Sequence, residues 1–165
     1  MKYDDASWHC EGNYPAGLPD ENAATHIGMF LKWCICQDLY SEFLLEESGE
    51  EIGKVKADDM TGAQFLMYWD GKFLDDMLSE TGNLFAKDYY GTGTKKSKFA
   101  KKFSDYDSDY HSIFNDKEKR TGIKYESIYH IEDTKENYDL VAKKIDERFA
   151  QWQKGSKKTL GDLFR

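Results

Sequence analysis

The feature that most constrains the fold is an apolar stripe near the C-terminal end of the chain. Five bulky side chains recur there at intervals of three and four residues: Tyr138, Val141, Ile145, Phe149 and Trp152. This spacing places them on one face of an α-helix, which must be buried against other elements. Asp133 or Thr134 is the expected N-cap. Gly155 predicts the end of the helix and leaves residues 155–165 as a possible loose tail.

Similar spacing recurs upstream and predicts a mainly α fold. Both prolines, Pro15 and Pro19, lie in residues 1–21, which predicts an irregular lead-in before the first long helix. Residues 123–131 alternate in side-chain type and form the one segment where a small β element is expected. No linker or repeat interrupts the chain, so we expect a single-domain, multi-helix bundle over residues 1–165. Its helices are expected at residues 21–39, 41–55, 61–69, 81–90, 103–114 and 133–154.

Aromatic residues make up 15% of the chain, so the core can be built mainly from aromatic rather than aliphatic side chains. The formal net charge of −8 argues against nucleic acid, because phosphate binding needs clustered lysine and arginine. An acidic protein is well suited to a basic protein partner, which long-range attraction would steer toward it. Solubility alone is the simpler explanation of the charge.

The sequence favours a cytoplasmic location and no membrane association. Three cysteines, Cys10, Cys34 and Cys36, are an odd number, and no apolar leader follows Met1. No stretch approaches the roughly 20 apolar residues of a membrane span. Reduced thiols in a cytoplasm are the simplest account of the cysteines.

No catalytic motif and no metal-ligand spacing stands out, so the sequence predicts neither an active site nor a cofactor nor a metal centre. Cys34 and Cys36 are two residues apart, and on a helix such side chains diverge too far to hold one ion. We expect both to be small buried side chains. Metal binding by His9, Cys10 and His26 together is a weaker alternative.

One cluster of polar and aromatic residues still marks the start of the chain. It consists of Asp4, Asp5, Trp8, His9 and His26. The irregular lead-in must lie against the first long helix, where His26 occupies an early turn. A contact between His26 and Asp4 or Asp5 would serve as a structural latch. Alternatively, the same groups would form a ligand- or metal-binding site of a small enzyme or binding protein.

A second region combines acidic and aromatic side chains at helical spacing. Its members are Asp105, Tyr106, Asp107, Asp109 and Tyr110. Tyrosines are common anchors of protein interfaces, and carboxylates steer a basic partner. We therefore name this region as the candidate partner-binding surface, with an ordinary solvated helix face as the alternative.

Two motifs are specific enough to suggest a family. They are KYDDASWH at residues 2–9 and ATHIGMFLKW at residues 24–33. Together with residues 17–19, 60–62, 70–73, 83–90, 132–139 and 145–152, they resemble an uncharacterised family of small acidic bacterial proteins, a domain of unknown function. Cys10 stands where this family is expected to have an aromatic residue.

The resemblance implies membership of this family but no particular biochemical activity. Small acidic bacterial proteins of this kind resemble immunity proteins, which neutralise a toxin from a neighbouring cell. The resulting expectation is a protein-binding module, toxin-neutralising in the sharpest form, that docks on a basic partner and is not an enzyme.

Overall fold

The computed structural model describes residues 1–93 and 95–163, with only the backbone described for residues 156–163. It confirms a mainly α fold with a small two-stranded sheet. In chain order the elements are β1 (Lys2–Asp5), α1 (Ala6–His9), η1 (Asp20–Ala24), α2 (Thr25–Cys36), α3 (Glu42–Lys56), α4 (Gly62–Tyr68), β2 (Lys72–Leu74), η2 (Asp75–Met77), α5 (Glu80–Tyr89), α6 (Lys98–Lys102), α7 (Tyr106–Thr121), η3 (Ile128–His130) and α8 (Lys135–Leu163). The elements written η are short 3₁₀ helices.

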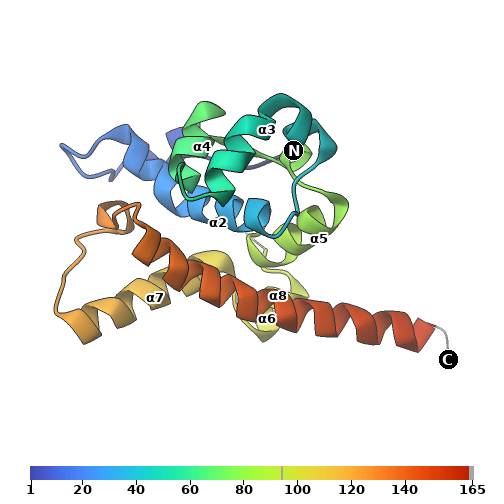
Figure 1. The fold of residues 1–165 in the computed structure, drawn as a ribbon. Coiled ribbons are helices and arrows are strands. Elements are labelled where there is room, and N and C mark those ends of the chain that lie inside the picture. Colours follow the sequence, from blue (N-terminus) through green and yellow to red (C-terminus); the bar gives the residue numbers. More distant parts are fainter. Residues whose placement is uncertain (94, 164–165) are drawn as a thin grey trace.

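Helix α2 forms the centre of the fold. It packs against α4 on one side and α8 on the other (Figure 1), and every residue from Thr25 to Ile35 is buried. Two glycines let α2 and α4 approach closely: a Cβ added at Gly62 would lie 1.9 Å from the carbonyl oxygen of Gly28. No larger residue fits at this crossing without moving a helix.

The core around α2 is built largely from rings, as the aromatic composition predicts. Phe30 lies within 4.9–6.3 Å, centroid to centroid, of Trp33, Phe73, Phe85, Tyr89, Tyr90 and Tyr106. Such offset and edge-on contacts add to the gain from burying the rings. Cys34 is buried as expected, whereas Cys36, the last residue of α2, is exposed.

Side-chain caps fix where several helices begin. The Ser41 hydroxyl accepts from the amide of Leu44 at the start of α3, and the Thr134 hydroxyl accepts from the amide of Asn137 at the start of α8. Thr61 and Gln64 form a complete capping box on α4. These caps satisfy amides that have no partner within the helix and confirm the expected starts of α3, α4 and α8.

The β structure lies elsewhere than the sequence predicted. Strand β1, inside the expected irregular lead-in, pairs antiparallel with β2, whereas residues 123–131 hold the short helix η3 in an otherwise irregular segment. Local hydrogen bonds explain the difference: the amide of Tyr125 donates to the Glu118 carboxylate, and Ser127 caps η3. Side-chain acceptors therefore satisfy backbone groups that a strand partner would otherwise have taken.

Helix α8 also differs from the prediction, because it continues through Gly155 to Leu163. One glycine in a helix costs only about 1 kcal/mol, so a long helix can include it. Of the expected loose tail at residues 155–165, only 164–165 lie outside the described residues. No described helix, α8 included, is both long and apolar enough to cross a membrane.

Candidate functional site

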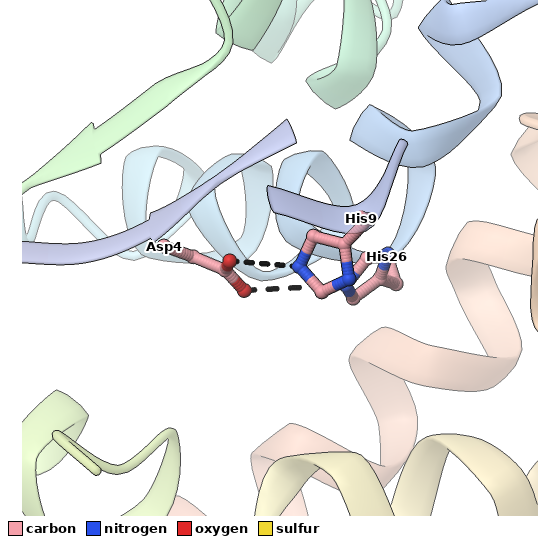
Figure 2. Close-up of side chains that lie close together, drawn as sticks. All are labelled: Asp4, His9 and His26. Atoms are coloured by element: carbon pink, nitrogen blue, oxygen red, sulfur yellow. Dashed lines mark hydrogen bonds and ion pairs between the residues drawn. The ribbon is translucent and has the colours of Figure 1, made fainter. Parts of the chain in front are cut away.

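Three side chains from three elements meet beside the start of α2. Asp4 comes from β1, His9 from α1, and His26 from the first turn of α2. Figure 2 shows the Asp4 carboxylate facing both imidazole rings. Its Oδ1 lies 2.8 Å from Nε2 of His9, and its Oδ2 lies 4.0 Å from Nε2 of His26. The two rings contact each other edge to face, with centroids 4.6 Å apart.

Local structure explains why these residues meet. Pairing with β2 fixes the backbone of β1, with Asp4 opposite Phe73. Asp5 then caps α1 by accepting from the amide of Ser7, and this single helical turn brings His9 back toward Asp4. A strand followed at once by one helical turn thus places two side chains, five residues apart in sequence, in direct contact.

Burial sets the charge of the groups in the cluster. His26 is largely buried, and this loss of hydration, with the nearby His9, lowers its pKa to about 4. The imidazole of His26 is therefore neutral at pH 7. Burial alone would raise the pKa of Asp4, but hydrogen bonds from His9 and Tyr90 outweigh it, and the pKa of Asp4 is lowered. Asp4 is therefore an anion that faces a neutral ring.

Two tyrosines hold the cluster from outside. The Tyr90 hydroxyl donates to Oδ2 of Asp4, and the Tyr129 hydroxyl lies 3.2 Å from Nδ1 of His9. One neutral tautomer of His9 satisfies both of its contacts: Nε2–H donates to Asp4, and Nδ1 accepts from Tyr129. As it stands, the cluster is thus a polar latch in which Asp4 and His9 are hydrogen-bonded and His26 of α2 contacts both.

The same geometry is close to that of a metal site. One ligand atom each from Asp4, His9 and His26 lies within 4.8 Å of the other two. Around a zinc ion with bonds of about 2.0–2.1 Å, tetrahedral ligand atoms lie roughly 3.4 Å apart. The more distant atoms would have to approach by up to about 1.4 Å, and Asp4 and His9 would have to separate by about 0.6 Å, to complete three of the four ligands of such an ion.

The structure brings together only part of the cluster named from the sequence. Asp5 is instead paired with Lys2 at 2.6 Å and caps α1. Trp8 is exposed beneath the ammonium group of Lys2. The Cys10 thiol donates to the backbone oxygens of Ala6 and Asp20, so Asp4 rather than Cys10 joins the two histidines. Tyr90 and Tyr129 could not be assigned to the cluster from the sequence, because no spacing rule connects them to Asp4.

The candidate partner-binding surface on α7 requires a correction. Tyr106 and Tyr110 are only 3% and 2% exposed, and both belong to the core. Asp109 is equally buried, between Arg148 and Tyr89. Asp105 caps α7 and binds Lys96, which leaves Asp107 as the exposed member. The spacing that suggested a surface stripe is instead the buried face of α7, so these tyrosines cannot anchor a partner.

Comparison with known proteins gives a family but no activity. A family model for a domain of unknown function (DUF7832) matches residues 2–131. This range contains every residue of the cluster and both sequence motifs, and it ends before α8. No curated protein and no solved structure is significantly similar to the chain.

Proposed function

Because the chain belongs to this family of domains of unknown function, DUF7832, its activity has to be argued from the site, and we propose that it binds a divalent transition-metal ion through Asp4, His9 and His26. The observation that carries the proposal is that one ligand atom each from two imidazoles and one carboxylate lie within 4.8 Å of one another, with the carboxylate facing both rings (Figure 2). Two histidines and one carboxylate are a ligand set found in zinc hydrolases and in non-haem iron(II) enzymes.

The protonation of the ligands supports the proposal. A metal ion needs a deprotonated carboxylate and neutral imidazoles. The lowered pKa values of Asp4 and His26 provide the carboxylate and one neutral imidazole at neutral pH. In the tautomer of His9 that fits its two contacts, the proton on Nε2 would have to move, and Nδ1 can receive it while the Tyr129 hydroxyl turns to become the acceptor. The metal would therefore replace the proton that now lies between His9 and Asp4.

The outer hydrogen bonds support the proposal as well. Metal-binding histidines usually donate their second ring N–H to an oxygen, and ligating carboxylates are themselves hydrogen-bonded. Tyr129 lies where the first role requires an oxygen, and Tyr90 fills the second role. Both partners would orient the ligands before the ion arrives.

The ligand set also indicates which ions fit. Imidazole nitrogen suits zinc and iron(II), whereas magnesium and calcium prefer oxygen ligands alone. Three protein ligands leave at least one position for water or a small molecule, as in catalytic rather than structural zinc sites. The His9 side chain is 25% exposed, so solvent reaches the cluster from its side.

Equilibrium dialysis of the metal-free protein against zinc, anaerobic iron(II) and magnesium tests the proposal. We expect one zinc or iron(II) ion per chain and no magnesium. His26→Gln should weaken binding by more than about 100-fold, because loss of an outer partner alone costs roughly 10–100-fold. His111→Gln is the control, since this exposed histidine on α7 forms an ion pair with Asp107, acts on His26 through its charge and is not one of the three proposed ligands.

A second variant separates a metal site from a purely structural latch. Tyr90→Phe keeps the ring in the core and removes only the hydroxyl that donates to Asp4. It should lower zinc affinity about tenfold or more. If the wild-type protein binds none of the three ions while Tyr90→Phe lowers its melting temperature, the cluster is a latch and the proposal is wrong.

A further inference from the structure

A groove on another part of the surface has the shape and charge of a binding site. It has a volume of about 360 Å³ and runs between α4, the segment around η1 and residues 131–133. This volume is near the lower end of the range for small-molecule sites, which is large enough for a few residues of a peptide. None of the three proposed metal ligands lines it.

The floor of the groove is apolar. Ala63 and Met67 come from successive turns of α4, and Ile131 lies across from them. Ala63 and Ile131 are 7% and 1% exposed, whereas Met67 is 38% exposed and forms an open edge. A methionine at the edge can adapt its shape to a bound side chain. The floor therefore favours an aliphatic stem rather than a fully hydrated ligand.

The rim of the groove is acidic. Glu21 and Glu132 are exposed on it, and Asp133 is partly buried beside them. No described lysine, arginine or histidine lines the groove. Burial raises the pKa of Asp133 more than its hydrogen bond with Thr61 and the charge of Lys32 lower it. A further cation at the rim would stabilise this carboxylate as an anion.

We propose that this groove binds a lysine or arginine side chain, with its apolar neighbours, from a basic protein partner. The long stem of such a side chain would lie on Ala63, Met67 and Ile131, while its charged head would reach the rim. The net charge of −8 would steer a basic partner toward the molecule. The proposal keeps the basic partner expected from the sequence but places it on α4, away from α7.

The test uses the full ¹⁵N-labelled chain and two peptides, acetyl-Ala-Leu-Arg-Leu-Ala-amide and the same peptide with glutamate in place of arginine. We expect the arginine peptide to shift the amide signals of Thr25, Ala63, Gln64 and Met67, which border the groove, and to bind more weakly at high salt. The glutamate peptide should shift none of them. No shift with either peptide, or shifts only elsewhere, would overturn the proposal.

Two variants and one small ligand sharpen the test. Asp133→Asn should weaken the arginine peptide about fivefold, and Glu132→Lys, at an exposed position, should weaken it at least as much. Asp116→Asn removes an exposed carboxylate on α7, away from the groove, and should leave the affinity for the arginine peptide unchanged. If agmatine, a free guanidine, binds as tightly as the peptide, the groove takes a small cation and not a protein segment.

Discussion

The buried ion pair between Arg148 and Asp109 connects α8 to α7 and yields a quantitative prediction. Nε and Nη2 of Arg148 donate to the two carboxylate oxygens of Asp109 at 2.7 and 2.9 Å, and the Tyr89 hydroxyl donates to the same carboxylate at 2.9 Å. The side chains of Arg148 and Asp109 are only 16% and 7% exposed. Arg148→Ala would leave a buried carboxylate with only the neutral donors Tyr89 and Ser104.

Removing one partner of such a pair costs about 3–5 kcal/mol, a large part of the roughly 5–15 kcal/mol that stabilises a domain. At about 2–4 °C per kcal/mol, the melting temperature of Arg148→Ala should fall by roughly 6–20 °C at pH 7. Lys144→Ala is the matched control, because it breaks an exposed pair with Glu147 on the same helix. That change should cost at most about 0.5 kcal/mol.

The pH dependence of this loss follows from the pKa of Asp109. Burial alone would raise that pKa, but hydrogen bonds from Arg148 and Tyr89 outweigh burial and lower it. The pair therefore contributes its full stability above the unfolded pKa of about 3.9 and loses it as the pH falls through the lower folded value. The difference in urea-unfolding free energy between wild type and Arg148→Ala should be largest at pH 7 and shrink below pH 4. A loss under about 1 kcal/mol at pH 7, or one independent of pH, would refute this reasoning.

Two pairs of variants test the packing by thermal and urea unfolding. Gly28→Ala should cost about 3 kcal/mol or more, because its Cβ would lie 2.3 Å from the backbone of α4, whereas Gly53→Ala on the open face of α3 should gain about 0.5–1 kcal/mol. Equal effects of the two would contradict the close crossing of α2 and α4. Tyr110→Phe should be neutral or stabilising, because its buried hydroxyl has no hydrogen-bond partner among the described residues. Tyr106→Phe should cost about 1 kcal/mol, because it loses a 2.6 Å bond to the backbone oxygen of His26; a greater loss from Tyr110→Phe would contradict both assignments.

The sequence predicted those parts of the fold that depend on local signals. The caps at Ser41, Thr61 and Thr134 need only a hydroxyl and the next turn of backbone, so they could be recognised from neighbouring residues. The apolar stripe of α8 likewise has a period that only a helix satisfies. The two strands were missed because β1 and β2 are short and are defined by pairing across some 70 residues, which no local pattern records.

Only part of the candidate site could be predicted from the sequence, for the same reason. Asp4, His9 and His26 stood out as chemically useful groups near the start of the chain, but their contact depends on the β1–α1 turn and on the packing of both against α2. Tyr106, Asp109 and Tyr110 of the predicted partner surface are buried instead, because alternating acids and rings are compatible with either an exposed or a buried face. Arg148 on α8 pairs with Asp109 and so allows this face of α7 to be buried.

X-ray absorption at the zinc edge, on protein loaded with one equivalent of zinc, tests the metal site most directly. We expect nitrogen and oxygen neighbours at about 2.0–2.1 Å, with the outer scattering pattern of two imidazole rings, and no sulfur. His26→Gln should remove one of the two rings from that pattern. A sulfur neighbour at about 2.3 Å would assign the ion to a cysteine instead, and a shell of oxygen atoms alone would contradict the site at Asp4, His9 and His26.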